Sequence, residues 1–196
     1  MRTRVVPALG ALVLALILSG CGDTGPDKKD RSASDAAAAS GEGGATYRLG
    51  EASPPQESAM QKYKGSTFTV TPTKVETGSR ADLEASGLEL DEGDGAKVPV
   101  YVSATLSLKS GKPMAVGDLD DDLVVRTDKG ERTRSLIVLM GQATWPNCPA
   151  QDTEKRLSAR QSESICNVFL IPQGQKPAAV ELTQGFTVAP LEWPVG

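Results

Sequence analysis

Hydrophobic and polar residues alternate along much of the chain after residue 66, which is the pattern of half-buried β-strands. In the clearest run, residues 97–109, every second residue is an aliphatic one and most residues between are small or polar. Phe68 and Val70 alternate with threonines in the same way. Pro72 restricts that strand to a sheet edge or a bulge, because proline donates no hydrogen bond to the ladder. We therefore expect strands with one buried face.

Further short apolar runs follow and are separated by glycine and proline turns. Residues 128–131, Asp-Lys-Gly-Glu, form the tight connection expected in a β-hairpin. A short helical pattern is found only around residues 80–88. After the turn at 110–113, the strands expected are 123–127, 133–140, 165–171, 179–183 and 186–188. Seven or eight short strands of this kind predict an all-β fold, an antiparallel β-sandwich.

The first twenty residues have a different pattern, typical of a targeting segment. Two arginines precede the apolar residues 5–18, a run too short to span a bilayer, which takes about 20 residues. The motif L-S-G-C at residues 18–21 resembles a bacterial lipobox. We expect Cys21 to be the acylated first residue of the mature protein, carrying a diacylglyceryl anchor and palmitate-type chains at the extracytoplasmic face of the cell membrane. A plain signal peptide or an uncleaved anchor is the alternative.

The next segment, residues 22–46, contains no Leu, Ile, Val, Met or aromatic residue. Such a segment cannot bury enough apolar surface to offset the entropy lost on ordering. We therefore expect a signal peptide at 1–20, the lipidated cysteine with a flexible linker at 21–46, and a β-sandwich domain at 47–196. Residues 47–50 are expected to form an edge strand that docks on this domain.

Composition excludes several classes of function. With 196 residues and 39% hydrophobic content, the chain can build one sizeable core. A net charge of −4 without a Lys/Arg cluster argues against nucleic-acid binding. The chain has no histidine, which excludes His-ligated zinc sites and Ser-His-Asp triads. Nucleophile-elbow, phosphate-loop and metalloprotease motifs are also missing, so we expect no enzyme and no cofactor. An enzyme of cell-wall glycans is the less favoured alternative, since paired carboxylates leave no sequence motif.

The chain contains three cysteines. If Cys21 carries lipid, Cys148 and Cys166 remain as a pair in an oxidising compartment, where disulfides persist. We expect them to be bridged, and closing that loop contributes about 3 kcal/mol in the chain-entropy model. A catalytic thiol is the alternative, but it would lack a histidine partner.

Acidic residues gather before one predicted strand. Four carboxylates, with three more in the glycine-rich residues 91–95, can hold a hard cation such as calcium if they converge. Solvated turns are the simpler interpretation. The candidate calcium ligands are Asp118, Asp120, Asp121 and Asp122.

The two tryptophans of the chain are candidates for different roles. Trp145 is in the motif W-P-N-C-P with Asn147, and an exposed tryptophan on a rigid loop is a recurrent recognition anchor. Packing of Trp145 on the neighbouring disulfide, as in many sandwiches, is the favoured alternative. Trp193, near the C-terminus, is expected as a lid on the sheet edge.

Five motifs occur in an order that is informative. They are Y-x-L-G-E at 47–51, F-T-V-x-x-x-K-V at 68–75, V-Y-V-x-x-x-L at 100–106, T-D-x-G at 127–130 and I-C-N-V-F-L-I-P at 165–172. This order resembles the extracellular immunoglobulin-like domain of unknown function in many bacterial, especially actinobacterial, surface lipoproteins. The resemblance implies an immunoglobulin-like sandwich, export and a cysteine pair, with no catalytic residues. It does not extend to residues 145–149.

These observations predict a lipid-anchored extracytoplasmic module that presents a β-sandwich to a protein or an envelope polymer. A calcium-binding surface protein that uses the region 118–122 is the alternative. Neither hypothesis involves nucleic acid.

Overall fold

The computed structural model describes residues 44–90, 96–120, 122–137, 143–185 and 187–196. The strands are β1 (Gln56–Glu57), β2 (Thr67–Thr77), β3 (Lys97–Ser110), β4 (Met114–Ala115), β5 (Leu123–Thr127), β6 (Arg132–Arg134), β7 (Arg156–Leu157), β8 (Ser162–Pro172), β9 (Pro177–Leu182) and β10 (Leu191–Pro194). The helical elements are η1 (Gln61–Tyr63), α1 (Arg80–Ala85) and α2 (Gly117–Asp120). No helix in the described ranges is long and apolar enough to cross a membrane. The expected signal peptide, Cys21 and most of the expected linker lie outside these ranges.

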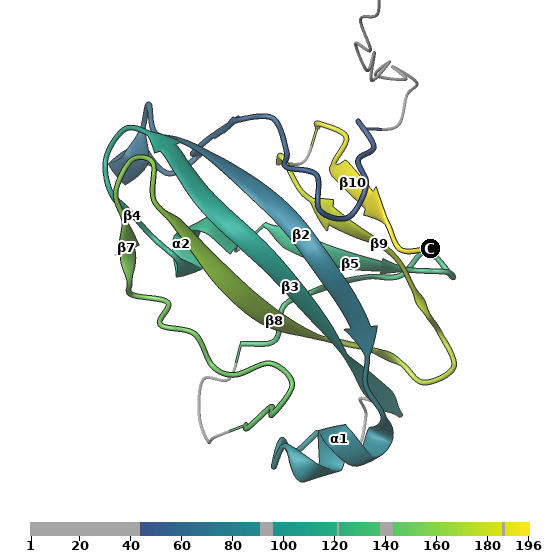
Figure 1. The fold of residues 1–196 in the computed structure, drawn as a ribbon. Helices are drawn as coiled ribbons and strands as arrows, with labels where there is room; N and C mark the ends of the chain where they lie inside the picture. Colours follow the sequence, from purple (N-terminus) through teal and green to yellow (C-terminus); the bar gives the residue numbers. More distant parts are fainter. Residues whose placement is uncertain (1–43, 91–95, 121, 138–142, 186) are drawn as a thin grey trace, which may run out of the picture. The chain divides into compact units, whose positions relative to one another are not determined.

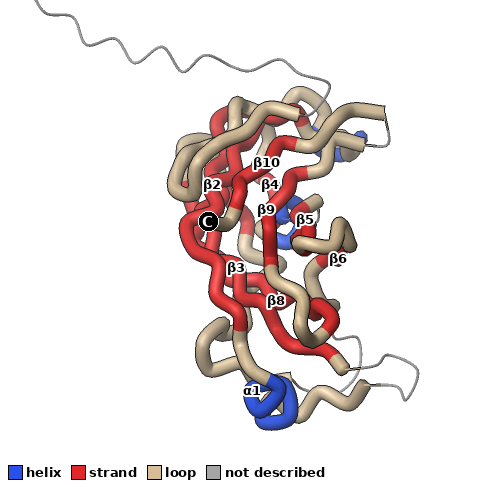
Figure 2. The backbone as a smooth tube through the Cα atoms, turned by 90° about the vertical axis from the view of Figure 1, so that its right-hand side faces the viewer, coloured by secondary structure: helices blue, strands red, loops and turns tan. Residues whose placement is uncertain are grey.

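The chain forms an antiparallel β-sandwich (Figure 1). One four-stranded sheet has the order β1-β2-β3-β8, the other has the order β10-β9-β5-β6, and β4 pairs with β7. Figure 2 shows α1 at the end of the domain opposite β4 and β10. The predicted fold class, all-β with antiparallel sheets packed as a sandwich, is confirmed.

Most of the expected strands are confirmed. The runs at 97–109, 123–127, 165–171 and 179–183 form β3, β5, β8 and β9. The strand around Phe68 extends to Thr77, and its register shifts between Pro72 and Lys74, where the proline predicted a bulge. The turn at 128–131 joins β5 to β6, and the short helix around 80–88 is α1. The strand expected at 133–140 ends earlier, at Arg134, and residues 138–142 are outside the described ranges.

The C-terminal strand was predicted at the wrong place. Residues 187 and 188 form a bend rather than a strand, and Val188 is 52% exposed. The sheet is completed by β10 instead, with Leu191 opposite Leu182. Trp193 on β10 is fully buried, and its Nε1 donates to the Glu51 carbonyl oxygen at 2.9 Å. Trp193 is therefore part of the core, although β10 is an edge strand. Burying its large apolar ring stabilises this position.

An N-terminal strap, residues 44–53, closes one open side of the sandwich beside β10 (Figure 1). Tyr47 N donates to the Glu192 carbonyl at 2.8 Å, and Gly50 N donates to the Pro72 carbonyl at 2.7 Å. The strap thus bonds to β10 on one sheet and to β2 on the other. The segment expected as an edge strand does dock on the domain, but through a single parallel bridge followed by a turn.

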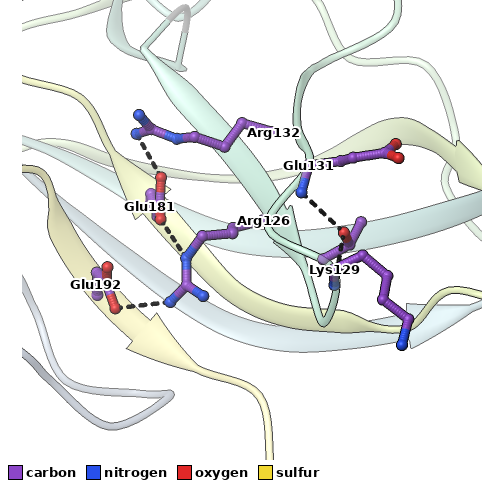
Figure 3. Close-up of polar contacts among 7 residues, drawn as sticks. Arg126, Lys129, Glu131, Arg132, Glu181 and Glu192 are labelled. Carbon is purple, nitrogen blue, oxygen red and sulfur yellow. Dashed lines mark hydrogen bonds and ion pairs between the residues drawn. The ribbon is translucent and has the colours of Figure 1, made fainter.

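A buried carboxylate connects four strands on the outer face of the second sheet (Figure 3). Glu181 on β9 is 1% exposed, and its Oε1 accepts a hydrogen bond from Arg126 Nε at 2.7 Å. Its Oε2 lies against the Arg132 guanidinium, and Arg126 also binds Glu192 at 3.0 Å. The hydrogen bond with Glu181 raises the pKa of Arg126. A buried carboxylate is costly unless it is paired, and here two guanidinium groups provide the pairing.

Replacing Glu181 tests this network. We expect Glu181→Ala to lower the free energy of unfolding by about 2 kcal/mol, because two arginines lose their shared partner. The control Glu192→Ala removes a carboxylate that is more exposed and leaves Arg126 paired with Glu181, so its cost should stay below about 1 kcal/mol. Urea denaturation measures both, and equal costs would contradict the assigned role of Glu181.

Candidate functional site

The predicted disulfide is present and shapes the site. Cys148 and Cys166 are bonded, with their Cα atoms 5.3 Å apart. Cys166 belongs to β8, whereas Cys148 lies in the segment between residues 143 and 156. The bond therefore holds this segment, which we call the stapled loop, against β8. With Cys148 only 2% exposed, the role of the pair is structural.

Trp145, which belongs to the stapled loop, packs inward against the first sheet rather than projecting into solvent. It is 8% exposed, and its ring meets the ring of Tyr101 edge-on with centroids 6.0 Å apart. Leu83 and Val168 complete this small cluster on the outer face of the first sheet. Trp145 thus has the buried position that was the favoured interpretation, and it is not an exposed recognition anchor. The alternation in β3 also misassigned Tyr101 to a polar face, because the loop that covers it comes much later in the chain.

A groove of about 670 Å³ lies beside the stapled loop and brings several predicted residues together. Asp118, Trp145, Cys148 and Cys166 all line it. Asn147 is exposed but does not line it. The groove has an apolar part formed by Leu136, Ile137, Ala143, Trp145 and Val168, and a charged part formed by Lys62, Asp118, Glu154 and Arg156.

The apolar part carries the most exposed large hydrophobic side chain of the described residues. Ile137 is 69% exposed, and it directly follows Leu136, whose N donates to the Val168 carbonyl at 2.7 Å. This bond fixes the backbone just before Ile137 against β8. Ile137 thus extends the apolar lining of the groove to the surface, and it is this continuous apolar area, not the single side chain, that can serve as an interaction surface.

The charged part is centred on Asp118. Its Oδ2 accepts hydrogen bonds from Lys62 Nζ at 2.9 Å and from Tyr63 Oη at 2.7 Å. Burial alone would raise the pKa of Asp118, but these two hydrogen bonds and the charges of Lys62 and Arg156 outweigh it and hold the pKa below its ordinary value. Lys62 and Arg156 also lie over the Tyr63 ring, at 4.7 and 5.9 Å from its centroid. Asp118 is therefore an ionised, paired carboxylate.

Of the four predicted calcium ligands, only Asp118 and Asp122 have described side chains, and each contacts other residues. Asp118 is engaged by Lys62 and Tyr63, and Asp122 has its Oδ1 3.5 Å from Thr183 Oγ1. Among the described side chains, no group of three or more Asp, Glu, Cys or His residues can hold a metal ion. The Asp120 side chain, Asp121 and residues 91–95 lie outside the described part. Calcium binding stays a prediction that no described side chain supports.

Sequence reasoning missed the partners of Asp118. Tyr63 is 55 positions away from it along the chain, and Lys62 is 56 positions away. No local pattern connects residues at such separations. The only available signal was Tyr63 itself, an aromatic residue in a stretch of small and charged residues before β2.

The groove offers neither a free thiol nor an imidazole. Both cysteines of the groove are in the disulfide, and the chain has no histidine to act as a base. Asp118 has a lowered pKa, which makes it a poor general base at neutral pH. The groove therefore offers an apolar surface next to fixed charges.

The lowered pKa of Asp118 predicts a dependence of stability on pH. A carboxylate with a depressed pKa contributes stability above its unfolded value of 3.8, and that contribution is lost as the pH falls through the lower folded value. We expect Asp118→Asn to cost about 1 kcal/mol at pH 7 and to cost much less near pH 2. Thermal melts across this range measure the difference. Glu89→Gln, at an exposed position, should show no such dependence.

Comparison with known proteins identifies the fold but no family. No family model and no curated protein matches the chain. Among solved structures, a secreted protein from Mycobacterium tuberculosis, MPT63, superposes with a TM-score of 0.51 at 12% sequence identity. The match covers 78% of this chain and 98% of that chain. At such low identity, the likeness concerns the β-sandwich architecture alone.

Proposed function

We propose that this protein is a lipid-anchored extracytoplasmic binding module without catalytic activity, and that the groove beside the stapled loop contacts its partner. The observation that carries the proposal is this groove, in which an exposed isoleucine and paired charges lie beside a disulfide-bonded loop. Loops fixed on a rigid sandwich are the usual place for recognition. A concave site of this volume is within the range of natural binding sites.

Three observations support a location outside the cytoplasm. The motif L-S-G-C at residues 18–21 follows an apolar run. A disulfide between Cys148 and Cys166 persists in oxidising compartments and rarely in the cytosol. MPT63, which has a similar fold, is described as a secreted protein.

The proposed mechanism is presentation of the sandwich to a partner. Acyl chains on Cys21 would keep the protein at the membrane, because two chains give stable attachment. The linker would let the domain search its surroundings. The strap at residues 44–53, which is hydrogen-bonded to both sheets, would connect this attachment to the domain.

Crosslinking at Ile137 tests the partner site. A photoreactive benzophenone amino acid at position 137, in the protein expressed in its native cells, should give a crosslinked species after irradiation. Val188 is the matched control, since it is also large, apolar and exposed but does not line this groove. Mass spectrometry then identifies the product. Equal crosslinking at both positions, or none at Ile137, would contradict the proposed site.

The variant Cys21→Ser tests the anchor. Growth with an alkyne fatty acid should label the natural protein and leave Cys21→Ser unlabelled, because serine has no thiol to acylate. The variant should appear in the medium or remain as a longer precursor. The control Cys148→Ser breaks the disulfide but should retain the label. An unlabelled natural protein would refute lipid anchoring.

A further inference from the structure

A second groove, of about 530 Å³, lies on the outer face of the first sheet. We call it the hydroxyl groove. The strands β2, β3 and β8 form its floor, and residues 149–152 of the stapled loop form its wall. Ala150, Gln151 and Cys166 line both grooves, so the two grooves adjoin along the stapled loop. All residues that line the hydroxyl groove are described.

The floor presents hydroxyl groups in rows across three strands. Thr105 on β3 lies opposite Ser164 on β8, and both line the groove. Thr73 on β2 and Ser103 on β3 form a second short row beside them. Ser103 and Thr105 alternate with the core residues Val102, Ala104 and Leu106, which puts their side chains on the outer face.

One of these hydroxyl groups is fixed by a hydrogen bond to the neighbouring strand. Thr73 Oγ1 donates to the Ser103 carbonyl at 3.1 Å. Thr73 sits at the bulge after Pro72, which turns its hydroxyl toward β3. Threonine has few rotamers on a strand, so little side-chain entropy would be lost when a ligand binds.

Two carboxylates add acceptors at the rim. Asp152 Oδ1 accepts from the backbone N atoms of Glu154 and Lys155, at 3.1 and 3.2 Å. Glu163 Oε2 binds Lys155 Nζ at 2.6 Å. The second oxygens of Asp152 and Glu163 accept no hydrogen bond from any described residue. Lys155 offsets part of the negative charge, so the groove is rich in acceptors without being strongly acidic.

We propose that the hydroxyl groove binds a neutral polysaccharide chain. Such a ligand is dense in O–H groups that both donate and accept, which matches hydroxyl rows bordered by carboxylate oxygens. An anionic polymer would meet Asp152 and Glu163, which disfavour it. An extended peptide docks by pairing with a sheet edge or by filling apolar pockets, and this floor consists of paired strands with short polar side chains.

This inference rests on the extracytoplasmic location in the proposed function, where envelope polysaccharides occur, but it does not depend on the groove at Ile137. Threonine-rich faces also stabilise sheets through cross-strand pairs. Stability alone would not require the loop to leave a groove over these rows, nor would it require carboxylate oxygens at the rim that accept no hydrogen bond from a described residue. Removing hydroxyl groups from the floor distinguishes a role in ligand binding from a role in sheet stability, because affinity and stability are measured separately.

Affinity electrophoresis of the full lipidated protein in detergent tests the proposal. The probes are three neutral polysaccharides in the gel, namely mannan, glycogen and arabinogalactan, with polygalacturonate as an anionic comparison. We expect at least one neutral polymer to retard the protein. The double variant Thr105→Val/Ser164→Ala should raise the apparent Kd about tenfold, since each lost hydrogen bond costs about half that free energy. The control Thr133→Val removes a hydroxyl from β6 of the other sheet and should change nothing.

Each outcome decides the proposal. Circular dichroism and thermal melts should show that the double variant is folded, and Glu163→Gln gives a second test that leaves the floor intact. The proposal is wrong if no neutral polymer retards the protein, if only polygalacturonate does, or if the double variant binds like the natural protein. Crosslinking at Ile137 is independent of these results, so either hypothesis can fail alone.

Discussion

The structure depends on the burial of one strand, β3, between its two neighbours and under the second sheet. Its inward residues from Val98 to Leu108 are at most 9% exposed, and β2 and β8 pair along nearly its whole length. Each fully buried Val or Leu side chain contributes about 1.5–3 kcal/mol to stability. Because only 4% of the residues are aromatic, the core depends on such aliphatic side chains. The strap, the Glu181 network and the stapled loop are all arranged around this layer.

The sequence pattern predicted the elements whose geometry depends on only a few neighbouring residues. The alternation in β3, the bulge at Pro72 and the hairpin turn at 128–131 each follow from backbone geometry within a few residues. The disulfide followed from compartment and cysteine count. The strand β10 could not be predicted in this way, because Phe186-Thr187-Val188 shows the same alternation as Leu191–Pro194. What distinguishes them is Trp193, whose burial depends on residues far away in the chain.

The candidate site was predictable in its members but not in its arrangement. Asp118, Trp145 and the cysteine pair were each identified from the sequence, and the fold places all of them along one groove. Their environments were not predictable, because Tyr63 reaches Asp118 across 55 positions and the stapled loop covers Tyr101 from another part of the chain. The hydroxyl rows were visible as alternating threonines and serines, but only the strand register aligns them.

The strap would have a mechanical consequence if the protein is held at a membrane, as proposed above. Its backbone bonds join the edge of one sheet at Glu192 and the edge of the other at Pro72. Tension arriving from the N-terminal side would be carried by this seam and divided between both sheets before it reached either groove. Under the proposed anchoring, the domain could then be pulled, or swept by flow, while the surfaces of its two grooves keep their geometry.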